Sequence, residues 1–176
     1  MAKPSADQTA FLNPLRVQVL STMQSMERFE DAALNELRTV PLGVLRRSAT
    51  QRHGVTRWER KADGRLTVAT VDLHPRLLNE AWADYAAFVL FHEFLHAMGW
   101  RAHDRRFRTL ESTWPDPKGA SRGLEFTHRM REGKATWYWV CPECEQRYPR
   151  QRRGGGRYLC RRCRQVLQDV AVQDAD

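Results

Sequence analysis

The 176-residue sequence lacks several features that would place it in other protein classes. It contains no run of about 18 apolar residues, which argues against a membrane-spanning helix. Its first residues, MAKPSADQTAFLNPL, contain no apolar core of a secretory signal, so we expect a cytoplasmic protein without membrane association. Cysteine is absent from residues 1–140, and all four cysteines lie between Cys141 and Cys163. Such confined cysteines favour metal binding over a disulfide framework in this compartment.

The composition is that of a folded protein with a basic excess. Hydrophobic residues make up 41% and charged residues 28%, which supports one ordinary domain plus a small additional module. The 29 Lys and Arg exceed the 21 Asp and Glu, for a net charge of +8. Most of this excess lies in residues 129–165, which carry 11 basic and 3 acidic residues, whereas the last eleven residues carry three Asp. The basic segment suggests a polyanionic partner.

Turn and cap residues predict the N-terminal elements. Asn13-Pro14 is typical of an N-cap followed by a first-turn proline, and it predicts a helix that continues to Pro41. Apolar residues follow at helical spacing: Leu15, Val19, Met23, Met26, Phe29, Ala33 and Leu37. Residues 54–73 alternate differently and predict a β-hairpin that turns at Asp63-Gly64. We expect the helix to cover the core without a direct functional role.

A second group of elements follows the hairpin. His74-Pro75 predicts the start of a largely buried helix, with Gly99 as its C-cap. A shorter helix is expected over residues 104–112, an interruption over 114–119, and a further helix around residues 124–130.

The predicted buried helix carries the sequence HEFLH at residues 92–96. His92 and His96 are four residues apart and therefore lie on one helical face, close enough to share a Zn²⁺ ion. Glu93 is positioned to act as general base toward a water on that ion. The alternative is a pair of hydrogen-bonded core histidines with Glu93 at the surface.

A catalytic zinc site needs a third protein ligand. His103, seven residues after His96 and beyond the break at Gly99, is the favoured candidate, with Glu111 or Glu125 as alternatives. The spacing is one residue longer than that of metzincins. For His53, His74 and His128 we expect no role in the site, because none has comparable spacing.

The cysteines form two C-x-x-C pairs that are fifteen residues apart. Cys141, Cys144, Cys160 and Cys163 therefore predict a closed structural zinc site of ribbon type. Arginines and aromatic residues alternate around these pairs, a combination suited to single-stranded or distorted nucleic acid. The residues expected to contact nucleic acid are Arg147, Arg150, Arg152, Arg153, Arg157, Arg161, Arg162, Tyr148 and Tyr158. Alternatively, the aromatic residues form the small core of the module and the arginines its solvated face.

The order of these motifs resembles the SprT-like family of Spartan-type, DNA-dependent zinc metalloproteases. The resemblance covers roughly residues 65–168 and rests on HEFLH, on HDRRF at residues 103–107, and on the segment that begins WYWVCPECEQRYPR. It implies that His92, His96 and His103 bind the catalytic zinc, that Glu93 is the general base, and that the four cysteines bind the second zinc. The connection before His103 is shorter than in many members, which bears on the pocket shape more than on the ligand set.

Together, motifs and resemblance predict an α+β protein with two modules. Residues 1–130 are expected to form a mainly helical, zincin-like metalloprotease domain with a small β-hairpin or sheet, residues 131–168 a basic four-cysteine zinc ribbon, and residues 169–176 an acidic tail. The expected activity is that of a monomeric, DNA-associated endopeptidase with two Zn²⁺ ions, one catalytic and one structural, whose substrates are proteins bound or crosslinked to DNA. A non-proteolytic transcription or repair factor with structural zincs is the alternative, and a peptidase unrelated to DNA is a third possibility.

Overall fold

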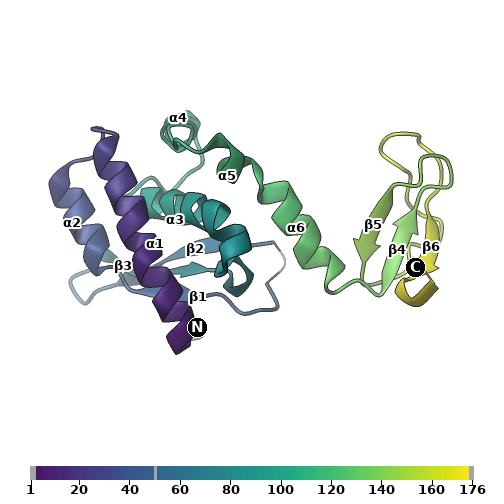
Figure 1. Ribbon diagram of the computed structural model, residues 1–176, viewed down its shortest axis with the longest axis horizontal. Coiled ribbons are helices and arrows are strands. Elements are labelled where there is room, and N and C mark those ends of the chain that lie inside the picture. Colours follow the sequence, from purple (N-terminus) through teal and green to yellow (C-terminus); the bar gives the residue numbers. More distant parts are fainter. Residues whose placement is uncertain (1–2, 50, 175–176) are drawn as a thin grey trace. The chain divides into compact units, whose positions relative to one another are not determined.

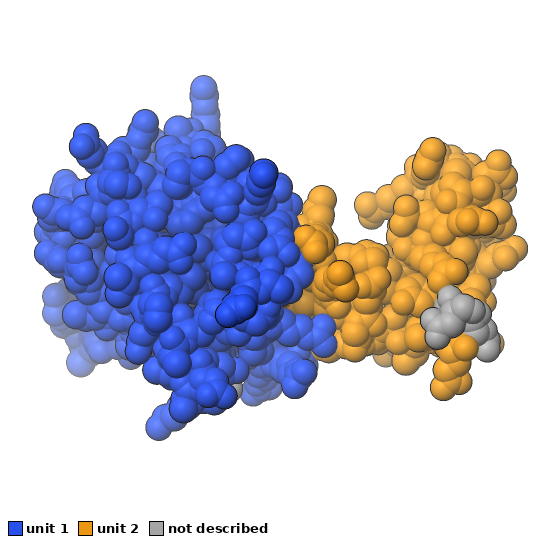
Figure 2. Space-filling model, in the orientation of Figure 1, with its two compact units in different colours: residues 1–123 blue, residues 124–176 orange. Residues whose placement is uncertain are grey.

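The computed structural model describes residues 3–49 and 51–174. These divide into two compact units, unit 1 (Met1–Gly123) and unit 2 (Leu124–Asp176), coloured separately in Figure 2. The division falls seven residues before the predicted domain boundary, because most of helix α6 (Gly123–Glu132) belongs to unit 2. The expected mixture of helices and small sheets is confirmed, and the zincin-like architecture stays a prediction.

Unit 1 begins with two helices where one was predicted. Helix α1 (Ala6–Ser25) starts eight residues before Pro14, because Ser5 accepts a hydrogen bond from the Gln8 backbone while the Gln8 side chain accepts one from the Ser5 backbone. Pro14 therefore lies inside the helix. The chain then turns through Glu27, whose φ is 52°, and α2 (Asp31–Thr39) follows. The predicted single helix was wrong at both its start and its middle.

The sheet of unit 1 has three strands in the order β1-β3-β2. Strands β2 (Gly54–Arg60) and β3 (Leu66–Leu73) form the predicted antiparallel hairpin, and Gly64 in its turn has φ 82°. Strand β1 (Leu42–Val44) pairs parallel with β3 and was missed, because three residues are too few to show an alternating pattern. Strand β2 is an edge strand, paired within the described residues only with β3.

Helix α3 (Ala83–Ala97) is the central element of unit 1 (Figure 1). It packs against α1, against β2 and β3, and against α5 (Pro117–Ser121). Its Phe91, Phe94 and Leu95 are fully buried. The helix begins nine residues later than predicted, because two 3₁₀ turns (Pro75–Leu77 and Glu80–Trp82) precede it. None of the helices in the described residues is long and apolar enough to cross a bilayer.

The end of α3 follows the sequence prediction closely. Gly99 has φ 106° directly after the C-cap Met98, as the predicted glycine stop requires. Helix α4 (Arg105–Glu111) then starts from Asp104, whose side chain accepts a hydrogen bond from the Phe107 backbone. Helix α5 starts inside the segment that was predicted to be irregular, because Asp116 caps it in the same way.

Unit 2 contains a three-stranded antiparallel sheet in the order β5-β4-β6. The strands are β4 (Trp137–Val140), β5 (Arg147–Arg150) and β6 (Gln168–Ala171), and a 3₁₀ turn (Val172–Asp174) follows. Asp169, predicted to belong to an acidic tail, lies in β6, where its carboxylate accepts hydrogen bonds from the Gly154 and Gly155 backbones at 2.7 and 2.9 Å. Asp176 of that predicted tail is outside the described residues.

The two C-x-x-C pairs of unit 2 form knuckles of equivalent geometry. In each, the backbone N–H of the first cysteine donates to the carbonyl of the glutamine five residues later, at 3.1 Å in the first knuckle and 2.8 Å in the second. The residue after the second cysteine, Glu145 or Arg164, has a positive φ and donates its N–H back to the first cysteine at 3.0 Å. Both knuckles thus turn through a left-handed residue that is not glycine.

Candidate metal centres

Three histidine side chains converge on one point of unit 1. The Nε2 atoms of His92 and His96 lie 3.2 Å apart, and the Nε2 of His103 lies 3.0 Å from His96 and 3.1 Å from His92. The first two come from successive turns of α3, and the turn at Gly99 brings His103 back toward them. The structure therefore brings together the three histidines that the spacing had singled out.

The spacing of these nitrogens fits a tetrahedral ion. Ligands about 2.0–2.1 Å from a zinc ion at tetrahedral angles lie roughly 3.3–3.4 Å from one another. The observed separations of 3.0–3.2 Å are close to that value. A triangle of three nitrogens also leaves one tetrahedral position for water or substrate, as catalytic zinc sites require.

Two of the histidines are oriented by acceptors on their other ring nitrogen. The Nδ1 of His92 lies 2.6 Å from Glu111 Oε1, and that of His96 lies 2.6 Å from the Trp100 carbonyl oxygen. These acceptors favour the tautomer in which Nδ1 carries the proton and Nε2 keeps its lone pair for an ion. Burial lowers the pKa of His96 and of His103, which also favours neutral rings.

Glu111 takes a different position from the one considered in the sequence. It does not join the nitrogen cluster but accepts a hydrogen bond from His92 on one oxygen and another from Arg108, at 2.8 Å, on the other oxygen. Burial alone would raise the pKa of Glu111, but these two hydrogen bonds outweigh it and lower the pKa to about 2. Glu125, the other alternative ligand, lies on α6 and belongs to neither cluster of metal-binding groups in the described residues.

Glu93 lies beside the cluster in a confined setting. Only 5% of the residue is exposed, and burial raises the pKa of its carboxyl group. The hydroxyl of Thr56 on β2 lies 2.8 Å from both Glu93 Oε2 and the Glu93 carbonyl oxygen. Gly54 faces the same side chain, since an added Cβ there would lie 2.8 Å from Glu93 Cγ and Oε1. Strand β2 therefore holds the carboxylate in place.

A pocket of about 600 Å³ opens over these groups. Its lining includes Glu93, the three histidines, Glu111 and residues of β2. His53 and Tyr85 line it as well, with His53 Nδ1 2.5 Å from the Tyr85 hydroxyl. The expectation that His53 has no place in the site was therefore wrong. His74 and His128 lie outside the pocket, as expected: His74 is buried and contacts backbone groups, and His128 pairs with Glu132 at 3.2 Å.

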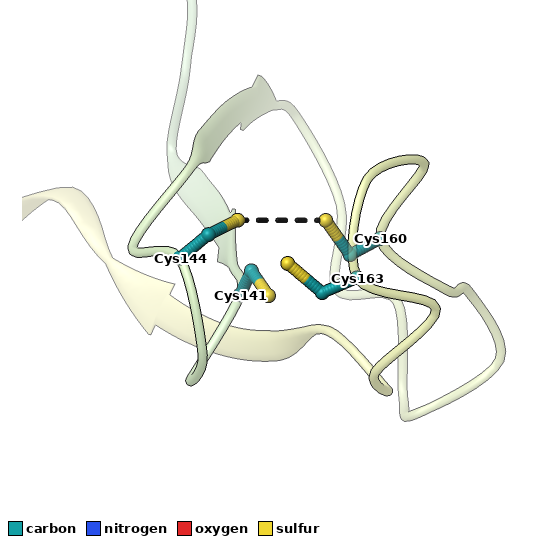
Figure 3. A group of neighbouring side chains, drawn as sticks. All are labelled: Cys141, Cys144, Cys160 and Cys163. Carbon is teal, nitrogen blue, oxygen red and sulfur yellow. Dashed lines mark hydrogen bonds between the residues drawn. The ribbon is translucent and has the colours of Figure 1, made fainter.

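The four cysteines of unit 2 form a zinc-binding site. Figure 3 shows Cys141, Cys144, Cys160 and Cys163 pointing toward one another from the two knuckles. The Cys144 and Cys160 sulfurs lie 3.7 Å apart, close to the roughly 3.8 Å expected for thiolates about 2.3 Å from a tetrahedral zinc. Cys141 and Cys160 are fully buried and pack with Leu167, Trp139 and Tyr148. The metal site is therefore also the core of this module.

The predicted nucleic-acid contacts lie around this site, and several pair with one another. Arg150 lies over the rings of Trp139 and Tyr148, and Tyr158 stacks on Trp139 with ring centroids 4.1 Å apart. Arg150 and Tyr148 are half-buried, so both belong partly to the module's packing. The other predicted residues are exposed on the module: Arg147, Arg152, Arg153, Arg157, Arg161, Arg162 and Tyr158.

Comparison with known proteins identifies one part of the chain. Residues 135–170, about a fifth of the sequence, match the family model of the SprT-like zinc ribbon domain. No curated protein and no solved structure matches the chain. The match coincides with the four-cysteine module and agrees with the family resemblance drawn from the motifs.

Metal analysis tests both centres. We expect two zinc ions per chain, one lost on His96→Ala and the other on Cys160→Ser, because each substitution removes a donor from one cluster alone. The measurement is zinc and protein quantification by mass spectrometry. A single zinc in the unaltered chain, retained by His96→Ala, would contradict the histidine centre.

The Glu111–His92 contact makes a second prediction. Glu111→Gln is expected to weaken metal binding at the histidine cluster roughly 10- to 100-fold, because the acceptor loses its charge. The dissociation constant is measured by competition with a chromophoric chelator. Glu132→Gln is the matched control, since it alters the His128–Glu132 pair outside either cluster and should leave both zinc affinities unchanged.

Proposed function

Residues 135–170 match the SprT-like zinc ribbon, and from this match and the histidine centre we propose a zinc-dependent endopeptidase that acts on DNA-associated or DNA-crosslinked proteins. The observation that carries the proposal is the buried carboxylate of Glu93 beside three converging imidazoles. A purely structural zinc site needs a closed set of ligands and no base. This cluster has three ligands, a base and an open pocket.

The residues divide the chemistry among them. His92, His96 and His103 would hold the ion. When bound, the ion would polarise the carbonyl group of the substrate and lower the pKa of a water molecule. Glu93 accepts a proton from the attacking water and delivers it to the leaving amine. Burial favours both transfers, because the raised pKa of Glu93 brings its proton affinity closer to the working pH. Thr56 orients the carboxylate throughout.

The position of β2 supports an extended peptide as substrate. Gly54, Val55, Thr56 and Trp58 of this edge strand line the pocket that contains Glu93. The free edge of a strand offers backbone N–H and C=O groups to a peptide that pairs with it. A polypeptide bound in this way passes directly over the site, which favours cleavage within a chain.

The ribbon supports nucleic acid as the partner that directs this activity. Seven arginines of the ribbon are exposed to solvent: Arg147, Arg152, Arg153, Arg157, Arg161, Arg162 and Arg164. So many positive charges close together repel one another, and a bound anion would relieve this repulsion. Guanidinium groups bind phosphates with two parallel hydrogen bonds. The exposed Tyr158 adds a ring on which a base can stack.

Substitution of the base tests the hydrolytic role. Glu93→Gln keeps the size of the side chain and should retain both zinc ions, while kcat for cleavage of a protein substrate falls at least about a hundredfold. Glu80→Gln, at an exposed position of unit 1, is the control and should cleave normally. Unchanged cleavage by Glu93→Gln would contradict the proposal, and a chain that never cleaves but still binds DNA would favour the accessory-factor alternative.

Addition of DNA tests whether nucleic acid stimulates the proposed proteolysis. Cleavage of a DNA-binding protein should increase when single-stranded DNA is added, and the increase should diminish as salt rises, because phosphate contacts weaken steeply with ionic strength. Equal cleavage with and without DNA would leave a peptidase whose ribbon docks on protein instead. The rate is followed by gel analysis across a salt series.

A further inference from the structure

Unit 1 has a basic surface that the nearly balanced charge of its sequence does not predict. Two adjoining hollows of about 490 and 280 Å³ share Val44, Leu45 and Arg46 in their linings. Six cationic side chains line them, together called here the unit 1 basic surface: Lys3, Arg46, Arg47, Arg52, Arg57 and Arg76. No Asp or Glu of the described residues lines either hollow.

Buried contacts hold the basic segments together. The chain leaving β1 turns through residues 46–49, with the Ala49 N–H donating to the Arg46 carbonyl at 2.9 Å. His74 is fully buried, and its Nε2 lies 3.1 Å from the Ala49 carbonyl oxygen while its Nδ1 accepts the Arg76 N–H at 3.1 Å. This histidine ties the Arg46 turn to the turn that carries Arg76.

The charge on this surface is largely uncompensated. Arg57 pairs with the buried Asp72 at 2.7 Å, so the negative charge of Asp72 offsets the positive charge of Arg57. Arg46, Arg47 and Arg52 are exposed and take part in none of the ion pairs of the described residues. Like charges held this close in solvent attract anions and repel one another.

The surface is continuous with the pocket over Glu93. Arg52 lines both the smaller hollow and that pocket. An anion bound at Arg52 would therefore lie beside the pocket that contains Glu93 and the three histidines.

We infer that the unit 1 basic surface binds the phosphodiester backbone of nucleic acid, so that the peptidase unit holds DNA itself and not through its ribbon alone. The inference rests on the proposed function for the identity of the polyanion. Two adjoining hollows suit successive phosphates of one strand, and five of the six cations are arginines, which bind phosphate oxygens in pairs. A membrane surface is disfavoured, because none of the large exposed apolar side chains of the described residues lines the hollows.

The experiment removes two arginines that lie outside the Glu93 pocket. The full chain carrying Arg46→Gln and Arg47→Gln is compared with the unaltered chain for binding to a fluorescein-labelled single-stranded oligonucleotide, by anisotropy across a salt series. We expect affinity near 0.1 M salt to fall roughly tenfold and the slope of log K against log salt to fall by about 1.4, since each lost single-strand phosphate contact removes about 0.7. Arg46→Lys with Arg47→Lys keeps the charge and should restore most of the slope.

The controls separate this inference from the proposed function. Arg28→Gln with Arg60→Gln makes the same change in net charge on exposed positions of unit 1 outside the hollows and should leave the slope unchanged. Arg157→Gln with Arg161→Gln alters the ribbon and should lower the slope independently. An unchanged slope in the Arg46/Arg47 variant, with a reduced slope in the ribbon variant, would overturn this inference and leave the proposed function intact.

The remaining outcomes are equally decisive. If no assay detected proteolysis, the proposed enzymatic function would be contradicted. A measured loss of DNA affinity in the Arg46/Arg47 variant would still support the inference about the basic surface. Absence of binding by the unaltered chain would overturn both. Arg46/Arg47-dependent binding to phosphatidylserine vesicles, with no change in binding to the oligonucleotide, would assign the surface to lipid and overturn the inference.

Discussion

A carboxylate that is almost completely removed from water on a central helix must be stabilised by the groups packed against it, and much of unit 1 is arranged around this requirement of Glu93. The edge strand supplies the Thr56 hydroxyl and, at Gly54, the space the side chain needs. Because β2 is paired with β3 and both strands pack on α3, the orientation of this carboxylate depends on the register between β2 and β3. A bulge between Arg57 and Trp58 changes that register only after Thr56 has been placed.

Sequence periodicity located the centres better than it located the elements around them. HEFLH, His103 and the cysteine pairs could be identified because their chemistry depends on short fixed spacings within one or two turns. The contribution of Thr56 and Gly54 could not, since it arises from contact between residues nearly forty positions apart. The start of α1 was missed because the helix begins at a capping box formed by Ser5, whereas the prediction relied on the preference of proline for the first turn and placed the start at Pro14. His53 lacked ligand spacing and reached the pocket through the fold alone.

Charge sums over sequence segments concealed the distribution of charge in space. Residues outside the ribbon carry nearly equal numbers of basic and acidic residues, which suggested that only the ribbon is basic. The fold gathers Arg46, Arg47, Arg52 and Arg76 from separate segments of the chain, and no Asp or Glu of the described residues lines the same hollows. A segment whose net charge is near zero can therefore fold into a unit with a strongly positive region. The contacts of the buried His74 with the Ala49 carbonyl and the Arg76 N–H, which join two of these segments, could not be predicted from the sequence.

The two knuckles of the ribbon have the same backbone geometry and opposite charge. The first reads CPECEQ, with Glu143 and Glu145, and the second reads CRRCRQ, with Arg161, Arg162 and Arg164. Both present these side chains to solvent from equivalent positions around one metal core. The module is therefore an electric dipole as well as a net positive charge, and a polyanion near it experiences a torque in addition to an attraction. A polyanion attracted by the second knuckle would be repelled by the first, so the module itself would favour one orientation of any polyanion that approaches it.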